Sequence, residues 1–138
     1  MHTFLITLLM LAGTINAPMS TLKVEITNVR KDAGTIRVAL YKPTDKFGTA
    51  KPDYFKVVPV TQAISYSTEF ELPQGDYAIA VYHDLNDNGK LDKNLVGYPK
   101  EPFGFSNNFR PILSAPSFKD CAFQLSQPAK TISINLID

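Results

Sequence analysis

The sequence contains only one cysteine, Cys121, and shows no excess of either charge. A single cysteine excludes an intramolecular disulfide, so a hydrophobic core or a metal must stabilise the fold. Lysine and arginine number 14 against 13 for aspartate and glutamate, which gives a net charge of +1, and neither sign clusters. This balance provides no basic stripe for nucleic acid and no lysine-rich amphipathic helix for a membrane surface.

The familiar catalytic motifs are absent as well. The sequence has no G-x-S-x-G elbow, no H-E-x-x-H pair and no glycine-rich phosphate loop. It has two histidines, and nothing indicates that either serves Cys121 as a base. Cys121 alternates with Phe123 and Leu125, a pattern that predicts a buried thiol. We therefore expect a protein that is not an enzyme.

Long helical patterns are missing, and ten prolines argue against them. Apolar and polar residues instead alternate with the period of β-strands. Seven segments carry this alternation: 22–27, 35–41, 54–60, 63–72, 76–83, 121–125 and 131–137. About seven short strands in a chain of this length predict an all-β fold, a single antiparallel β-sandwich of immunoglobulin-like or prealbumin-like type.

Residues 1–17 differ from the rest of the chain. Residues 4–12 are almost wholly apolar, and no Lys, Arg, Asp or Glu occurs before Lys23. This run is too short to span a bilayer but suits the apolar part of a signal peptide, with Ala17 as a small residue near an uncertain cleavage site. We expect export to the periplasm or the outside of the cell. Residues 18–138 would then form one β-sandwich domain without a transmembrane segment.

The most informative stretch reads Asp-Leu-Asn-Asp-Asn-Gly-Lys-Leu-Asp, from residue 84 to residue 92. Its oxygen-bearing side chains match positions 1, 3, 5 and 9 of a calcium loop, and its glycine matches position 6, where the loop turns sharply. Position 7 contributes a main-chain carbonyl, so the candidate ligands are Asp84, Asn86, Asn88, Lys90 and Asp92. Few carboxylates contribute, so we expect a structural calcium site with a weak affinity of about 10⁻⁴ to 10⁻³ M.

Two features distinguish this stretch from an EF-hand. Position 12 is Leu95 instead of a bidentate glutamate, and residues 77–83 before the loop have the pattern of a strand. Glu101 is a candidate for the missing carboxylate, and another residue or water would also serve. The alternative is an ordinary surface turn, because Asn, Asp and Gly are the residues that tight turns prefer.

Residues 84–118 have little strand pattern but many apolar residues, which predicts one long ordered loop. Part of this loop is a candidate platform for an extracellular glycan, peptide or protein partner, formed by Tyr98, Phe103, Phe105, Asn107 and Asn108. The competing interpretation is a small satellite core under the loop. A third hypothesis is a hydrolase that uses His83, Asp84 or Glu101.

Two motifs occur together in this region, H-D-x-N-x-N-G-x-x-D at 83–92 and G-F-S-N at 104–107. With the flanking segments 34–41, 116–118 and 132–136, they resemble a family of small exported bacterial proteins of unknown function. That resemblance implies a single β-sandwich domain behind a signal peptide, and no activity. A wider similarity to prealbumin-like and surface-repeat domains implies calcium in related loops. The C-terminal Tyr-Arg-Gly-Ser of prealbumin-like hydrolases is absent, so their activity is not implied.

Overall fold

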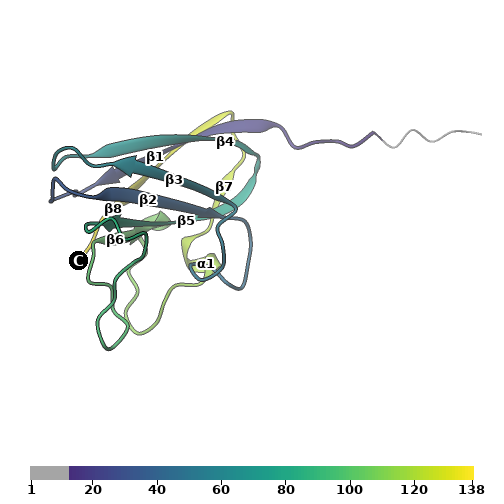
Figure 1. The fold of residues 1–138 in the computed structure, drawn as a ribbon. Coiled ribbons are helices and arrows are strands. Elements are labelled where there is room, and N and C mark those ends of the chain that lie inside the picture. Colours follow the sequence, from purple (N-terminus) through teal and green to yellow (C-terminus); the bar gives the residue numbers. More distant parts are fainter. Residues whose placement is uncertain (1–12) are drawn as a thin grey trace, which may run out of the picture.

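The structure is a computed structural model that describes residues 13–138 (Figure 1). Residues 13–18 form an exposed irregular segment before the first strand. The prediction of a signal peptide at 1–17 falls mostly on residues 1–12, which lie outside the described residues, so export stays a prediction. Within residues 13–138, no helix is long and apolar enough to cross a membrane.

Two β-sheets pack against each other, as Figure 1 shows. The first sheet has the strand order β4-β1-β8, formed by Tyr66–Pro73, Met19–Thr27 and Ala129–Asn135. The second has the order β3-β2-β5-β6, formed by Tyr54–Pro59, Thr35–Tyr41, Gly75–Asp84 and Phe103–Phe105. A further short strand, β7 (Phe123–Leu125), pairs with the start of β5. The predicted β-sandwich is confirmed.

The core lies between the sheets because each strand directs alternate side chains inward. In the middle of β1, β2 and β5 every second residue is apolar, and these side chains are almost completely excluded from water. Ile134 of β8 and Leu136 after it belong to the same cluster, together with Leu22, Val24, Ile26, Ile36, Val38, Leu40, Ile79 and Val81. Burial of such side chains is the main favourable contribution to folding.

One strand pair is parallel, which the expected antiparallel sandwich did not include. β8 runs beside β1 in the same direction, with Ile132 opposite Val24. The other ladders between strands of residues 13–138 are antiparallel. After β7 the chain crosses to the first sheet and pairs with the free side of β1. An alternating strand buries the same face in either direction, so its pattern does not indicate direction.

The expected long loop 84–118 is divided by regular structure. It contains β6, the 3-10 helix η1 (Ser106–Asn108) and the start of helix α1 (Phe118–Cys121). Ser106 is buried and holds this region to the sheet, because its hydroxyl accepts the Ile79 N–H at 2.9 Å and donates to the Cys121 carbonyl. Two loops are left, 85–102 and 109–117, and both extend beyond the sheet at the bottom of Figure 1.

A second apolar cluster lies on the outer face of the second sheet. It consists of Ala39, Tyr41, Phe47, Ala78 and Cys121, with further aromatic rings packed against them. Burial raises the pKa of the Cys121 thiol to about 12, so the sulfur is protonated and inaccessible. The predicted buried thiol is confirmed, although the residue ends α1 and does not begin a strand. β5 is therefore covered on both faces.

The turn into β2 permits a specific test. Gly34 has φ +72°, and a Cβ there would lie 2.0 Å from the Asp84 carbonyl oxygen. Gly34→Ala must displace the end of β5, so we expect it to lower the free energy of unfolding by more than about 2 kcal/mol. Gly48→Ala is the matched control, because φ is +76° there and no atom lies within 4 Å.

For Gly48→Ala we expect a loss of about 1 kcal/mol, the backbone contribution alone. Urea unfolding followed by far-UV circular dichroism measures both variants. Equal losses would contradict the close approach of Gly34 to Asp84.

Candidate metal centre

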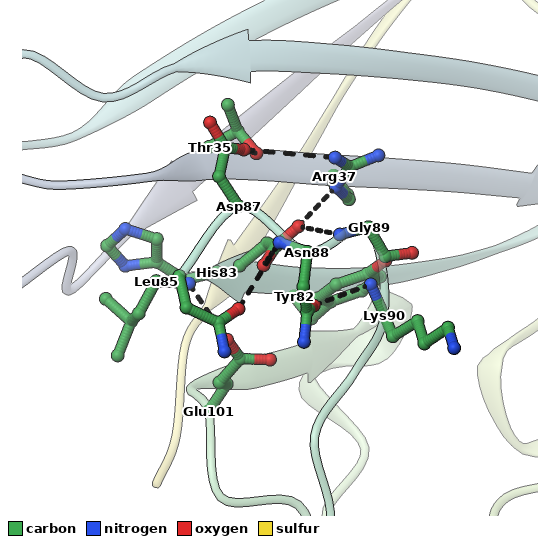
Figure 2. Close-up of polar contacts among 12 residues, drawn as sticks. Thr35, Arg37, Tyr82, His83, Leu85, Asp87, Asn88, Gly89, Lys90 and Glu101 are labelled. Atoms are coloured by element: carbon green, nitrogen blue, oxygen red, sulfur yellow. Dashed lines mark hydrogen bonds and ion pairs between the residues drawn. The ribbon is translucent and has the colours of Figure 1, made fainter.

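Asp84 ends β5, and its side chain is completely buried on the outer face of the second sheet. Arg37 of the neighbouring strand β2 donates from Nε to Asp84 Oδ2 at 2.8 Å. The same guanidinium lies 3.9 Å from Asp87 Oδ1, which also accepts the Thr35 hydroxyl at 2.8 Å (Figure 2). The carboxylate at calcium-loop position 1 is thus paired with a cation that the sheet supplies.

The turn that follows wraps around the same carboxylate. The N–H of Asn88 donates to Asp84 Oδ1 at 3.1 Å, and the N–H of Gly89 donates to Oδ2 at 2.8 Å. Asp87 and Gly89 have φ values of 58° and 78°, a left-handed conformation that glycine adopts without steric cost. Gly89, at position 6 of the loop, therefore makes the sharp turn that the sequence predicts there.

Three side chains converge on the exposed side of the turn. Asn86 Nδ2 donates to Asp92 Oδ2 at 2.8 Å, and Asn88 Nδ2 donates to Asp92 Oδ1 at 2.9 Å and to Oδ2 at 3.1 Å. These bonds, first from Asn88 and then from Asn86, lower the pKa of the Asp92 carboxyl. Positions 3, 5 and 9 of the candidate loop are thus brought together around one carboxylate.

Glu101 closes the base of the loop. Its carboxylate is buried, and it accepts the N–H of Leu85 at 2.9 Å (Figure 2). It also accepts the N–H of Asp92 at 3.0 Å. The N–H of Lys100 also donates to the Asp92 carbonyl at 2.8 Å. Glu101, one candidate for position 12, therefore lies beside the loop, where its oxygens accept hydrogen bonds from main-chain amides.

The remaining loop positions contribute main-chain groups. The N–H of Lys90 donates to Asn88 Oδ1 at 3.0 Å, and the Tyr82 hydroxyl donates to the Gly89 carbonyl at 3.1 Å. Leu95, at position 12, is fully exposed. Within residues 13–138, no three His, Cys, Asp or Glu side chains are grouped closely enough to hold a metal. A cation here would depend on asparagine and main-chain oxygens together with Asp92.

His83 and Asp84, adjacent in β5, point to opposite faces of the sheet. His83 is buried, its Nε2 lies 2.7 Å from the Ala33 carbonyl oxygen, and its Nδ1 has no hydrogen-bond partner. Asp84 is paired with Arg37, and Glu101 is engaged by two amides. The three residues of the hydrolase hypothesis therefore do not converge on a common space.

The candidate ligand platform separates into two groups. The rings of Tyr98 and Phe103 lie 5.7 Å apart, and those of Phe103 and Phe105 lie 5.9 Å apart. Asn107 instead donates to the Ala122 carbonyl at 2.9 Å, and Asn108 accepts the Asn135 N–H at 2.9 Å. The structure brings the three aromatic residues together and uses the two asparagines to connect η1 to neighbouring segments.

Sequence reasoning did not find Arg37 or Thr35, which complete the surroundings of the loop. Both alternate with apolar residues in β2, as any solvated outward-facing residue would. Their role follows from strand pairing, which places Thr35 opposite Asp84 and Arg37 opposite Tyr82. A strand pattern does not indicate which strand lies next to it, so the sequence carried no usable signal.

A family model described as an uncharacterized protein conserved in bacteria, DUF2141, matches residues 24–133. The chain belongs to this family. The match runs from β1 into β8 of the DUF2141 protein and includes the whole candidate metal centre. No curated protein and no solved structure matches. The resemblance to a bacterial family of unknown function is confirmed.

Glu101 of this DUF2141 protein accepts hydrogen bonds from the N–H groups of Leu85 and Asp92, and we call this pair of bonds the Glu101 clamp. A nearly isosteric change tests it. Glu101→Gln replaces one acceptor oxygen with an NH₂ group that faces a main-chain N–H. We expect a loss of about 1–3 kcal/mol in the free energy of unfolding, because a buried donor loses its acceptor. Glu69→Gln, on the exposed side of β4, is the control and should change stability by less than about 0.5 kcal/mol. Urea unfolding in chelator measures both, and equal effects would refute the clamp.

The environment of Asp92 predicts a titration. Its folded pKa is lowered, so its contribution to stability is present above the ordinary carboxyl pKa and is lost as the pH falls through the lowered value. Asn88→Ala removes the largest cause and should raise the pKa of Asp92 towards the ordinary value. Carboxyl ¹³C NMR titration of the wild type and the variant in chelator measures this shift. An unchanged Asp92 pKa would contradict the described hydrogen bonds.

Proposed function

We propose that this DUF2141 protein is an exported, non-enzymatic β-sandwich protein whose Asp84–Asp92 loop binds one calcium ion for a structural purpose. The observation that carries the proposal is the convergence of Asn86, Asn88 and Asp92, at 2.8 to 3.1 Å, on the exposed side of the turn. These residues occupy positions 3, 5 and 9 of the calcium-loop register. Export rests on the apolar segment at the N-terminus.

The two asparagines suit a cation because an amide carries a donor and an acceptor at similar distances from its carbon. Rotating each amide by half a turn would direct Oδ1 towards the space beside Asp92, at the cost of the bonds that these oxygens now accept from the N–H groups of Asn88 and Lys90. The Lys90 carbonyl and water would supply further oxygens. Calcium accepts such a mixed, flexible set of six to eight oxygens, whereas magnesium requires a nearly ideal octahedron.

The charges around the loop favour weak binding. Arg37 compensates the carboxylate of Asp84 and also lies near Asp87. Asp92 is then the one carboxylate on the exposed side that only neutral amides contact. Calcium affinity rises with the number of charged ligands, so a dissociation constant of about 10⁻⁴ to 10⁻³ M is expected, which is typical of extracellular modules.

The alternative of a carbohydrate or peptide platform has less support. Such a platform needs hydrogen-bonding groups next to the aromatic faces, and the amides of Asn107 and Asn108 already bind main-chain groups. The aromatic residues instead border an apolar pocket, which indicates a different kind of ligand.

Calcium binding predicts a rise in thermal stability. A ligand present at ten times its dissociation constant stabilises the folded state by about 1.4 kcal/mol, which raises Tm by roughly 5 °C in a domain of this size. We expect this rise in millimolar calcium relative to chelator, and a much smaller one in magnesium. Differential scanning calorimetry of the purified protein measures it.

Asp92→Asn is the informative variant, because it removes the exposed carboxylate and keeps the hydrogen-bonding shape of the side chain. It should abolish the calcium response, whereas Asp45→Asn should retain it. Asp84 is a poor choice for this test because its removal leaves Arg37 without a partner, whether or not a metal binds. An absent calcium response, or one that survives Asp92→Asn, would reject the proposal.

A further inference from the structure

An apolar pocket of about 540 Å³ lies on the outer face of the second sheet. Its floor includes Ala39 of β2 and Ala80 of β5, which are direct partners in the strand register. Two methyl side chains opposite each other leave the sheet surface low at this point. Phe105 pairs with Ala80 on the other side, and its ring packs against that of Phe47, with centroids 6.0 Å apart, so the two rings form one wall. The volume is in the range that small-molecule ligands occupy.

The rim of the pocket is apolar and open to water. Val96 of loop 85–102, and Ile112 and Leu113 of loop 109–117, line the pocket, yet they are 87 %, 92 % and 98 % exposed. Both loops extend beyond the sheet at the bottom of Figure 1. Scattered exposed aliphatic residues are ordinary, but a group of them around a concave apolar surface is typical of a binding site.

One charged residue, Lys93, is among those that line the pocket. Within the described part of the chain, the salt bridges involve other cations, and Lys93 forms none. An anionic group bound there would complement this charge, while the rest of a ligand would contact hydrocarbon. The pocket thus matches a molecule that is apolar along its body and negative at one end.

We propose that this pocket binds a single amphiphilic monocarboxylate of the fatty-acid class. Its hydrocarbon chain lies over Ala39 and Ala80 and against the rings of Phe47 and Phe105, and its carboxylate lies at Lys93. A chain in this position covers part of the exposed rim and removes that apolar surface from water, which favours binding. The proposal does not depend on calcium, because none of the candidate metal ligands lines the pocket.

A membrane surface or a second protein would also cover the rim, but neither would contact Ala39 and Ala80 at the floor of the pocket. Binding is therefore measured by isothermal titration calorimetry with decanoate below its micelle concentration, in chelator because calcium precipitates long-chain carboxylates. We expect saturable binding of one decanoate per chain. Lys93→Gln should weaken it about tenfold, the effect of losing one charged hydrogen bond, and should leave decanol binding unchanged. Lys100→Gln, an exposed lysine that does not line the pocket, is the matched control.

Filling the floor provides the decisive variants. Ala39→Leu and Ala80→Leu place a branched side chain in the space assigned to the ligand, and each should reduce decanoate affinity by at least about tenfold. Ile112→Ser changes a fully exposed rim residue, so it weakens binding without a risk to folding. Circular dichroism confirms that each variant is folded.

Several results would overturn the proposal. These are the absence of decanoate binding to the folded wild type, equal binding by the folded floor variants, and equal weakening by Lys93→Gln and Lys100→Gln. Binding only above the micelle concentration, or equal binding of wild type and floor variants to phosphatidylcholine vesicles without binding of free decanoate, would assign the rim to a membrane surface.

Discussion

The buried carboxylate of Asp84 is the constraint on which the loop region depends. A charge that is removed from water is costly unless cations and hydrogen bonds replace the lost solvation. Here Arg37 and the main-chain N–H groups of Asn88 and Gly89 do so, and together they connect β2, β5 and the turn after β5. These groups hold the turn against the second sheet, and a calcium ion, as proposed, would add its ligands on the other, exposed side of the turn.

The same region connects the candidate metal centre to the pocket. The Asp92 side chain accepts hydrogen bonds within the loop. Its main chain bonds to the segment that follows, because its N–H donates to Glu101 and its carbonyl accepts the Lys100 N–H. From there residues 93–99 form a small closed turn, in which the N–H of Asn94 donates to the Tyr98 carbonyl at 2.8 Å. This turn carries the rim residue Val96 and the lining residue Tyr98. The hydrogen bonds of loop 84–92 thus hold the start of the turn 93–99, which contributes Val96 and Tyr98 to the pocket.

The sequence indicated the parts of the fold that depend on local pattern. The strand at 35–41 was predicted with the bounds that the structure gives, because its inward residues alternate regularly over seven positions. β6 was not predicted, since it has three residues with glycine in the middle and is held by Ser106 and by pairing with β5. The candidate metal ligands were found by their spacing. Arg37 was not, because only strand pairing brings it to Asp84.

The pocket includes aromatic residues that the sequence analysis singled out, in an arrangement that the sequence does not reveal. Tyr98, Phe103 and Phe105 were read either as a ligand platform or as a satellite core, and the structure gives them both kinds of surroundings: Phe103 is buried, while all three border the same hollow. What creates that hollow is the absence of side-chain volume at Ala39 and Ala80. In a linear sequence each alanine looks like an ordinary strand residue, and only their register opposite each other leaves space above the sheet. The ligand-binding capacity proposed for this face therefore depends as much on two small residues as on the aromatic rings around them.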